Sequence, residues 1–487
     1  MNTGNPTMAD PLEPLRARTS QPDAVAGDWL VLGNTLLERA NGDRALLREA
    51  IDALVRAYRL DANCDPRLLH NVAQTAFILR DWPLVESATA LLLARDAGDA
   101  NALVWRAAVF QERDDFAEAQ RLLHEAARAA PGNHIVLHKL ALSIKEQGRF
   151  GEAEALLRRV LEMTPNNAHA MFDLSELEVR AGRYAQGWLD YEARVAFAHD
   201  ANAAKAALAA ISPNWRGESL AGKKLVVYGE QGNGDCLWAV RFLPMLAERA
   251  QREGGRVVFG YAGPMQHLFE RMLPNGIAVE TSLDTKPDYH CGLMSLPLRL
   301  GVNDPSTWGR PYLSADPARV EAWRERVASA TAEGKKKIGI VWNGNPDHIR
   351  DRRRSVDAEA FARILDVPGV TFFAISPGRG QTVGQWRSQG FDVVDLTPQF
   401  EAGFDDVAAL LVNLDVLLTI DSGPAHLAGA LGVPTWLMLD HVSAWFWGEE
   451  TERTPWYRTV ELFRQPSVGA WAPVLDQVRA RLEAFAA

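Results

Sequence analysis

The sequence is poor in the residues that build disulfide frameworks, metal centres and membrane spans. Only three of its 487 residues are cysteines, Cys64, Cys236 and Cys291, and their wide spacing fits neither a disulfide-rich domain nor a structural zinc site. No run approaches the roughly 18 to 20 apolar residues of a membrane helix. Residues 1–26 are polar and lack the apolar core of a secretory signal. We therefore expect a cytoplasmic protein with no membrane span and no bound metal.

The sequence also carries less positive than negative charge. The formal net charge is −10 at pH 7, which argues against a general affinity for nucleic acid or for an anionic membrane. One local exception is the basic cluster at 350–354, "RDRRR". The length predicts two or three domains, because a single hydrophobic core rarely grows to this size.

Residues 66–199 repeat with a period of 34 residues. This spacing resembles the tetratricopeptide repeat, in which small residues let two helices approach and aromatic residues fill the gaps. Residues 28–62 are predicted to form a further, less regular unit. Such arrays commonly hold a peptide or protein on their concave face; the alternative is an array that only supports or dimerises its neighbour. The small positions are Ala73, Ala107, Ala141 and Ser175, and the aromatic positions are Trp82, Phe116, Phe150 and Tyr184.

The remainder of the chain alternates apolar strands with helices, which predicts parallel sheets. An alanine-rich helix from Ala201 to Pro213 leads into it. We expect two doubly wound domains that face each other across a cleft, with ligands at the carboxyl ends of the strands. The predicted domains are a flexible N-terminus (1–27), a repeat array (28–210), a first α/β domain (211–330) and a second (331–487). The predicted strands are 223–229, 256–262 and 277–282, then 337–344, 370–376, 391–396, 415–421 and 434–439, and the predicted helices include 235–252, 264–273, 319–337, 358–366 and 404–413.

A glycine-rich turn follows the first predicted strand, in "YGEQGNGDCLWAVRFLP" (228–244). Gly232 and Gly234 are predicted to allow close backbone approach and positive φ. Asp235 can cap the next helix, or it can take a proton from an acceptor hydroxyl if it faces the cleft. Glu230 is the competing acid.

Two further polar turns belong to the second α/β domain. In "VWNGNPDHIRDRRRS" (341–355), Asn343 can hydrogen-bond a ligand, and the arginines form either a solvated face or an anion site with Arg354 as the main cation. In "TIDSGPAHLAGALGVPTWLML" (419–439), Gly423 is predicted to permit a sharp exit from the strand, and Pro424 suits the first turn of a helix.

The second of these turns has the features of an anion site. Its helix N-terminus offers free amides and the positive end of a dipole. Ser422 adds a hydroxyl donor. The dipole favours a neutral His426, which can still donate one hydrogen bond. The alternative is a tight strand-to-helix turn with no ligand.

Together, "EQGNGD" with "RFLP", "WNGNPDHIRDRRRS", "DSGPAHLAGALGVPTWLML" and "PWYRTVELFRQP" resemble the motifs of bacterial tetratricopeptide-repeat glycosyltransferases. That group is similar to heptosyltransferases and, more distantly, to protein O-GlcNAc transferases. The resemblance implies a GT-B pair of Rossmann-like domains after an α-solenoid, a nucleotide-sugar donor held mainly by the second domain, and an inverting, metal-independent transfer without a cofactor.

The resemblance also implies roles for particular residues. Asp235 is the candidate base. The loop beside it, which approaches the acceptor, comprises Gln231, Gly232, Asn233 and Gly234. The candidate donor-binding residues are Asn343, Arg354, Ser376, Asp421, Ser422, Gly423, Pro424 and His426.

Some positions depart from the family pattern. Asn233 and Cys236 replace an apolar residue and a threonine beside the "GD" pair, and the turn "ISPGRG" (375–380) replaces one that carries glutamine or lysine. Arg379 can compensate in that turn. Three hypotheses follow: a transferase whose repeats recruit a protein acceptor, a transferase acting on a lipid-linked or saccharide acceptor, and a scaffold that binds a ligand without turnover.

Overall fold

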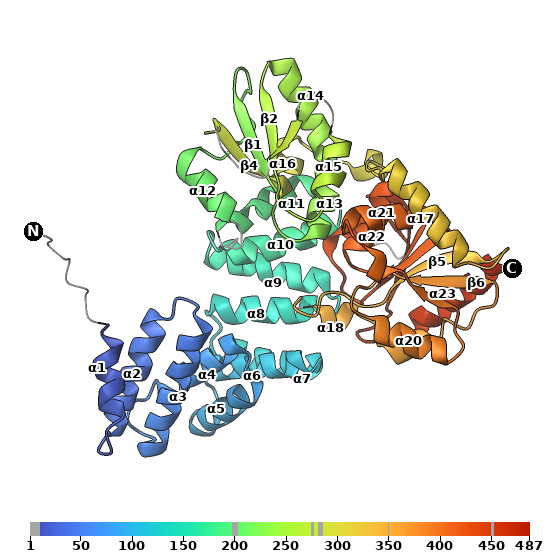
Figure 1. Ribbon diagram of the computed structural model, residues 1–487. Helices are drawn as coiled ribbons and strands as arrows, with labels where there is room; N and C mark the ends of the chain where they lie inside the picture. Colours follow the sequence, from blue (N-terminus) through green and yellow to red (C-terminus); the bar gives the residue numbers. More distant parts are fainter. Residues whose placement is uncertain (1–9, 197–202, 274–276, 281–285, 349, 450–451) are drawn as a thin grey trace, which may run out of the picture. The chain divides into compact units, whose positions relative to one another are not determined.

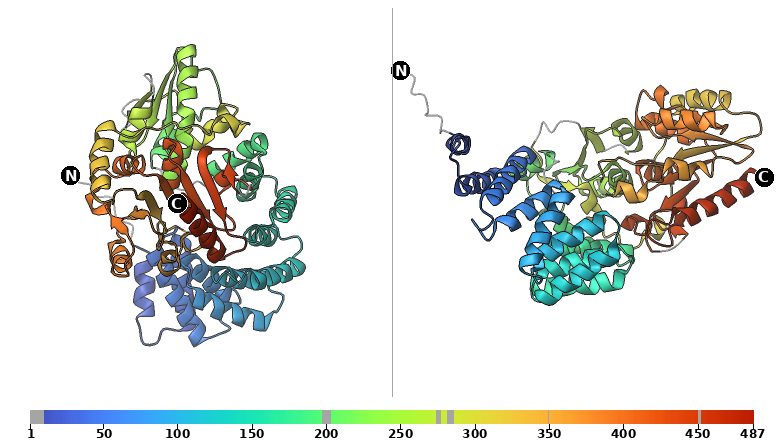
Figure 2. Two further views of the ribbon diagram at one scale, coloured as in Figure 1. Left: turned by 90° about the vertical axis from the view of Figure 1, so that its right-hand side faces the viewer. Right: turned by 90° about the horizontal axis from the view of Figure 1, so that it is seen from below.

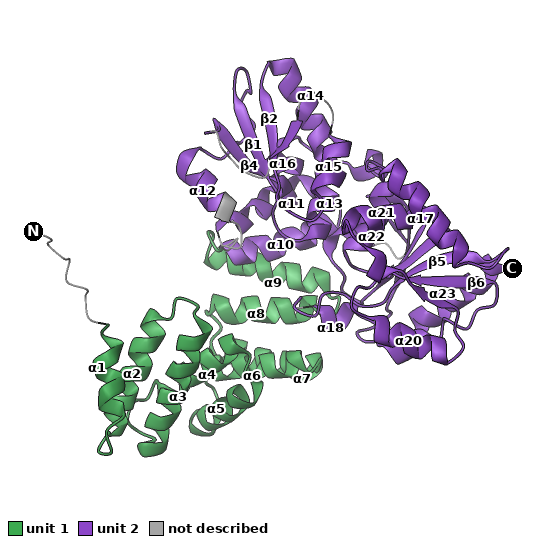
Figure 3. Ribbon diagram, in the orientation of Figure 1, with its two compact units in different colours: residues 1–167 green, residues 168–487 purple. Residues whose placement is uncertain are grey.

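The computed structural model describes residues 10–196, 203–273, 277–280, 286–348, 350–449 and 452–487. The chain divides into two compact units, residues 1–167 and residues 168–487, shown in green and purple in Figure 3. The boundary lies before the last predicted helix pair, so the domain limits at 210 and 330 stay predictions.

The first unit is a series of helices packed in consecutive pairs (Figure 1). Its small landmark positions, among them Ala73, Ala107 and Ala141, have no exposed surface, as the repeat pattern predicts. The second helix of three pairs begins at an aromatic landmark, and side chains such as Asp81 and Asp115 cap two of these helices. The helices are α1 (Leu12–Thr19), α2 (Ala26–Arg39), α3 (Arg44–Leu60), α4 (Leu68–Leu79), α5 (Trp82–Arg95), α6 (Ala100–Glu112), α7 (Phe116–Ala129), α8 (His134–Lys145) and α9 (Phe150–Met163).

The predicted flexible N-terminus is wrong for part of its length. Residues 12–19 form helix α1, because Leu12 is buried in a cluster with Leu32 and Leu36 of α2. Arg16 also donates two hydrogen bonds to the carboxylate of Glu49, at 2.6 and 2.7 Å. Residues 1–9 lie outside the described residues.

The second unit begins with the last helix pair, α10 (Ala168–Arg180) and α11 (Tyr184–Tyr191). This pair keeps the repeat register, because Ser175 is fully buried and Tyr184 begins α11. Trp188 of α11 packs against Trp238 and Trp445, with ring centroids 5.9 and 5.5 Å away. The aromatic contacts explain why the pair belongs to the same compact unit as the α/β region.

The first sheet of this unit has the order β3-β2-β1-β4, and all its strands are parallel. The strand β4 was not predicted. The predicted helix 235–252 is divided into two helices and a short 3₁₀ turn, and residues 281–282 of the predicted third strand lie outside the described residues. The elements are α12 (Ala203–Ile211), β1 (Lys224–Tyr228), α13 (Asn233–Ala239), α14 (Leu243–Glu253), β2 (Arg256–Gly260), α15 (Gln266–Met272), β3 (Ile277–Glu280), β4 (Tyr289–Gly292) and α16 (Leu296–Arg299).

The second sheet has the order β10-β11-β9-β8-β5-β6-β7, and only the edge strand β10 is antiparallel. Its central strands β5, β6, β8 and β9 are buried apolar runs, as in sheets covered by helices on both faces. Figure 2 shows the long helix α23 running along this sheet. The elements are α17 (Pro317–Ser329), β5 (Lys336–Val341), α18 (Asp351–Arg354), α19 (Ala358–Ala362), β6 (Val370–Ala374), α20 (Gly380–Ser388), β7 (Val393–Asp395), α21 (Phe404–Leu411), β8 (Val416–Ile420), α22 (Gly423–Leu431), β9 (Thr435–Leu439), β10 (Arg453–Thr454), β11 (Tyr457–Arg464) and α23 (Trp471–Ala486).

Both sheets therefore present polar turns at the carboxyl ends of their central strands, where ligands bind in this class of fold. The predicted helical repeats followed by α/β domains are confirmed. Among the residues that the structure describes, no helix combines the length and apolarity needed to cross a membrane.

Candidate functional site

The first turns of α13 and α22 meet between the two sheets, and Figure 1 shows the two helices side by side. The contact is close because Gly234 lies against the imidazole of His426. A Cβ placed on Gly234 would stand 2.9 Å from Cδ2 and 3.3 Å from Nε2 of that ring. The structure therefore brings the glycine-rich turn of the first sheet onto the predicted anion site of the second, as the predicted close approach at Gly234 requires.

Asp235 is a half-buried carboxylate in the first turn of α13. Its Oδ2 accepts a hydrogen bond of 2.8 Å from the backbone N–H of Gly232, so it does cap the turn. Burial raises the pKa of Asp235 to about 6, with further contributions from the negative charges of Asp421 and Glu230. The hydrogen bond opposes this rise but does not cancel it. A carboxyl group with such a pKa is a suitable proton acceptor near neutral pH.

Glu230 is held in a buried ion pair, and this distinguishes it from Asp235. Its Oε1 accepts 2.7 and 3.0 Å hydrogen bonds from Arg194 Nη2 and the Met294 backbone N–H. The side chain of Arg194 is only 2% exposed, so the two charges depend on each other. Glu230 therefore ties the segment after α11 to the first sheet, and its lone pairs are already engaged.

The loop 231–234 differs in conformation from the prediction. The glycines Gly232 and Gly234 do not adopt positive φ; instead Gln231 does, at 63°. The Tyr191 hydroxyl donates a 3.1 Å hydrogen bond to Gln231 Oε1, which helps to hold the residue in place. Gln231, Gly232 and Asn233 are all exposed, as an acceptor-side loop requires.

Arg354 connects the polar turn at 341–355 to the polar turn at 421–424. Its Nη1 donates to the backbone carbonyl of Asp421 at 3.1 Å, and its Nε donates to Asp351 Oδ1 at 3.2 Å. A Cβ on Gly344 would stand 2.6 Å from Arg354 Nη2, so a glycine is needed there for the guanidinium to lie against the loop. Among the described residues Nη2 has no partner, and the guanidinium is mostly buried, with 15% of its side chain exposed. The N–H groups of Nη2 are thus left for an anion at the start of α22.

The turn 421–424 is half-exposed, and Pro424 occupies the first helical turn as predicted. Ser422 is the N-cap residue but makes no capping hydrogen bond with its side chain; its Oγ donates to the Ile420 carbonyl at 3.2 Å. Strand β8 ends at Ile420 and α22 begins at Gly423, so the chain leaves the strand sharply, as predicted, without a positive φ at Gly423. A Cβ on Gly423 would meet only Phe404, at an ordinary 3.6 Å. The neighbouring protein atoms therefore leave room for a side chain at position 423. The close approach of a ligand is then the reason for a glycine at this position.

His426 is 3% exposed and sits among aromatic rings, with ring centroids 4.8 Å from Trp447 and 5.0 Å from Phe446. Burial, together with the positive charge of Arg241, lowers the pKa of His426 to about 3. The imidazole is therefore neutral at physiological pH, in agreement with the prediction. Its Nδ1 is 3.0 Å from the hydroxyl of Tyr457.

Asn343 and Ser376 lie just beyond the carboxyl ends of the neighbouring strands β5 and β6. Asn343 Oδ1 and Ser376 Oγ are buried and have no hydrogen-bond partner among the residues that the structure describes. Buried polar atoms in native proteins nearly always have a hydrogen-bond partner. Two such atoms without a partner, at the edge of the sheet where ligands bind, therefore indicate that a ligand or a water molecule binds there. In the same turn, the half-buried Arg379 has no side-chain partner among the described residues.

The sequence interpretation assigned no role to a group of residues behind His426. Arg241 donates to the carbonyls of Trp238 and Trp456 at 2.7 and 2.8 Å and to the Tyr312 hydroxyl at 2.9 Å. Tyr457 lies beside it, with the guanidinium 4.6 Å from the ring centroid. Both residues occur in the motifs "RFLP" and "PWYRTVELFRQP", so the signal was present in the sequence.

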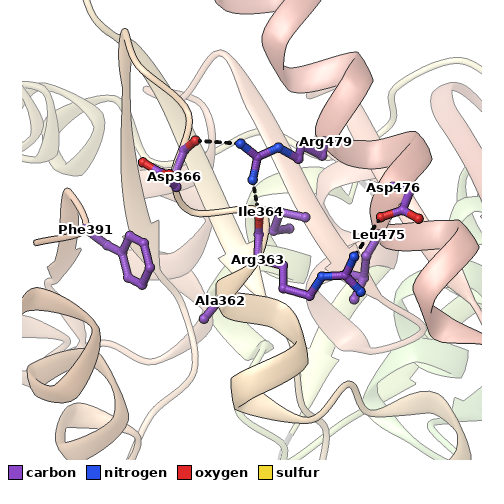
Figure 4. Close-up of a pocket in the computed structure, with 8 residues that line it drawn as sticks. All are labelled: Ala362, Arg363, Ile364, Asp366, Phe391, Leu475, Asp476 and Arg479. Carbon is purple, nitrogen blue, oxygen red and sulfur yellow. Dashed lines mark hydrogen bonds and ion pairs between the residues drawn. The ribbon is translucent and has the colours of Figure 1, made fainter. Parts of the chain in front are cut away.

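Figure 4 shows a pocket of about 420 Å³ elsewhere in the second unit. It is lined by residues that precede β6 and β7, such as Asp366 and Phe391, and by α23. It therefore lies at the amino ends of these strands, away from the predicted ligand edge. Both of its arginines are engaged within the protein, since Arg363 donates to Asp476 at 3.2 Å and Arg479 donates to the Asp366 carbonyl at 3.2 Å.

The three cysteines are free. Within the described ranges, no group of three or more histidine, cysteine, aspartate or glutamate residues is placed to share a metal ion.

The model of the tetratricopeptide repeat family matches residues 145–187, which include α9 and α10. The chain contains a tetratricopeptide repeat. It is also similar to Protein FlbA of Caulobacter vibrioides, with 26% identity over 393 residues that cover 74% of this chain. The matched region spans 63% of the length of that relative.

Two solved structures each resemble part of the chain. A glycosyl transferase family 9 protein from Veillonella parvula matches 52% of this chain and 88% of its own, with 17% identity and a TM-score of 0.40. A tetratricopeptide-repeat protein from Thermus thermophilus matches 35% of this chain and 91% of its own, with 19% identity and a TM-score of 0.30.

Proposed function

We propose that the protein is a glycosyltransferase that moves a sugar from a nucleoside-diphosphate sugar to an acceptor hydroxyl. The observation that carries the proposal is the meeting of two complementary groups at the junction of α13 and α22. One is the half-buried carboxylate Asp235, with its pKa raised to about 6. The other is the helix N-terminus at 421–424, with Arg354 hydrogen-bonded beside it. A proton acceptor and an anion site are what this reaction needs.

The proposed reaction is a single displacement. The acceptor oxygen attacks the anomeric carbon and gives its proton to the Asp235 carboxylate. The bond between that carbon and the diphosphate oxygen breaks, and the electron pair leaves with the diphosphate. Attack from the side opposite the leaving group inverts the anomeric centre.

The leaving group gains negative charge as its bond breaks. The amide and dipole of α22, the spare donor of Arg354 and the neutral imidazole of His426 can stabilise this charge without a metal ion. Asn343, Ser376 and Arg379 extend the same edge of the sheet, where they can hold the nucleotide or the sugar.

For the acceptor, we favour a protein recruited by the helical repeats in the cytoplasm. Arrays of this kind commonly bind peptide segments on their concave face. If the acceptor is instead a lipid-linked or free saccharide, the repeats have only a supporting role. The two possibilities can be distinguished by which molecule, the protein or the saccharide, gains the mass of the sugar.

Calorimetric titration with a panel of nucleoside diphosphates tests the donor site. The proposal predicts that at least one nucleotide binds, with its affinity reduced by Arg354→Ala. A second titration with the corresponding nucleoside monophosphate should show weaker binding, because the site recognises the diphosphate. A protein that binds no member of the panel would leave the turn at 421–424 a purely structural feature.

A further inference from the structure

Behind His426, on the side away from α13, the hydroxyl of Tyr457 lies 3.0 Å from Nδ1. The Tyr457 ring is held against α22, because a Cβ on Gly429 would stand only 2.4 Å from its Cδ1. Tyr457 has no exposed surface. The position of its hydroxyl is thus set by the packing of the ring.

The protons of the neighbouring groups can be assigned from their contacts. The Tyr312 hydroxyl donates to the Leu237 carbonyl at 2.7 Å and accepts from Arg241 Nη2 at 2.9 Å. The single proton of Tyr457 then has two possible acceptors, His426 Nδ1 at 3.0 Å and the Tyr312 oxygen at 3.5 Å. The distance of 3.0 Å is that of an ordinary hydrogen bond, whereas 3.5 Å is too long for a good one.

A donated hydrogen bond from Tyr457 fixes the tautomer of the imidazole. A neutral imidazole has one N–H donor and one acceptor nitrogen, and the bond made by one nitrogen decides the state of the other. If Nδ1 accepts from Tyr457, the hydrogen is on Nε2. Arg241 favours the neutral form, because a buried guanidinium beside the ring repels a second positive charge.

The Nε2 edge of the ring faces the first turn of α13. It lies within 3.3 Å of the position that a Cβ on Gly234 would take, next to Asp235 in sequence. Among the residues that the structure describes, no atom accepts a hydrogen bond from Nε2. The residue is 3% exposed, and this nitrogen is directed at the candidate site.

We propose that Tyr457 is a positioning residue that holds His426 as the Nε2–H tautomer, so that this N–H is ready to donate to an oxygen of the donor diphosphate. Arg241 and Tyr312 support it by orienting the hydroxyl network behind the ring. The inference rests on the proposed function for the identity of the ligand, whereas the tautomer depends only on the contacts described here. If Tyr457 only fills space in the aromatic cluster, the hydroxyl has no effect on the tautomer.

Tyr457→Phe separates these roles, because it keeps the ring that packs on Gly429 and removes only the hydroxyl. Tyr289→Phe in β4 is the matched control, since it removes a tyrosine hydroxyl from the same unit at a position without contact to His426. The protein is labelled with ¹⁵N at its histidines, and the imidazole signals of His426 are assigned by their loss in His426→Gln. The chemical shifts of the two ring nitrogens show which carries the hydrogen.

The expected result is an Nε2–H tautomer in the wild type and in Tyr289→Phe, and a mixture of tautomers in Tyr457→Phe. Affinity for the nucleoside diphosphate that binds best should fall roughly three- to tenfold in Tyr457→Phe, the worth of one neutral hydrogen bond. Affinity for the corresponding nucleoside, which lacks phosphate, should stay unchanged if any is measurable. A purely structural loss would weaken both ligands together.

Two results would overturn the inference: a wild type with the hydrogen on Nδ1, or a Tyr457→Phe variant with an unchanged tautomer and unchanged diphosphate affinity. Failure of the proposed function gives a different result. A wild type that binds no nucleoside diphosphate would refute the ligand, and with it the role of the N–H toward a phosphate, while the nitrogen shifts would still decide whether Tyr457 sets the tautomer.

Discussion

Asp235→Asn is the change that best separates catalysis from structure at this site. Asparagine has nearly the same shape, and its side-chain oxygen can still accept the hydrogen bond from the Gly232 N–H. It cannot accept a proton from an acceptor hydroxyl. We expect transfer to fall by about two to four orders of magnitude, the usual worth of a positioned general base, while nucleotide affinity stays within about twofold of the wild type.

The pKa of about 6 at Asp235 also fixes the shape of the pH profile. Below pH 6 the carboxyl group is protonated, so kcat/KM should fall about tenfold for each pH unit, and above pH 6 it should level off. In Asp235→Asn the residual rate should lack this inflection.

Thermal stability supplies an independent check, and its sign can be derived. The carboxyl group has a pKa of 3.8 ordinarily and a pKa of about 6 in the folded protein. The unfolded chain therefore releases this proton first, and the wild type loses stability as the pH rises from about 4 to 6. The full loss is at most about 3 kcal/mol above pH 6, because a pKa difference of one unit corresponds to about 1.4 kcal/mol.

Asp235→Asn carries no such charge. It should melt at or above the wild-type midpoint at pH 7.5, and this advantage should disappear below pH 4. The assays are transfer rate against pH and thermal midpoint at both pH values, with Asp235→Ala as the variant that loses base and cap together. An asparagine variant with full activity, or a wild-type rate that is flat from pH 5 to 7, would refute the role of Asp235 as base.

Three other predictions concern residues around the same site. Glu230→Gln should lower the thermal midpoint, because the buried Arg194 then keeps Glu192 as its carboxylate partner and loses the other, and breaking a buried pair costs up to about 3–5 kcal/mol; an unchanged midpoint would contradict the ion-pair assignment. Arg354→Ala should weaken nucleoside diphosphate binding by about 1.5–3 kcal/mol, while Arg352→Ala, an exposed charge in the same loop, should change it little; equal effects in calorimetry would mean that only the net charge of the loop matters. Gly423→Ala should keep the wild-type melting midpoint, because only Phe404 is near, and lose nucleotide affinity; full affinity would remove close ligand approach as the reason for this glycine.

Local sequence patterns predicted most of the fold because most of its elements are set locally. The repeat register placed Ala73 and Trp82 correctly, and long apolar runs located β5, β6, β8 and β9. The strand β4 was missed because it is only four residues long, Tyr289–Gly292, and includes a polar His290. The strand β11 was also missed, because its buried and more exposed residues do not alternate regularly along "YRTVELFR".

The sequence predicted the separate turns of the candidate site, but it did not predict how these turns contact one another. The positive φ was assigned to glycines, whereas Gln231 adopts it with the help of a hydrogen bond from the distant Tyr191. The contact of Gly234 with His426 depends on how two sheets pack together, which no local pattern encodes. The same is true of Glu230, whose role as an ion-pair partner became visible only when Arg194 was placed beside it.

The central claim is that this chain transfers a sugar and that Asp235 acts in the chemistry. The most direct test is to incubate the purified protein with a panel of nucleoside-diphosphate sugars and an extract of cells that lack the chain, then to analyse the extract by mass spectrometry. The account predicts that one donor gives a new glycan mass on an acceptor with the wild type, and that Asp235→Asn gives almost none despite binding the same nucleotide. A wild type that binds a donor yet adds no mass to any acceptor would contradict it, and would make the protein a ligand-binding scaffold.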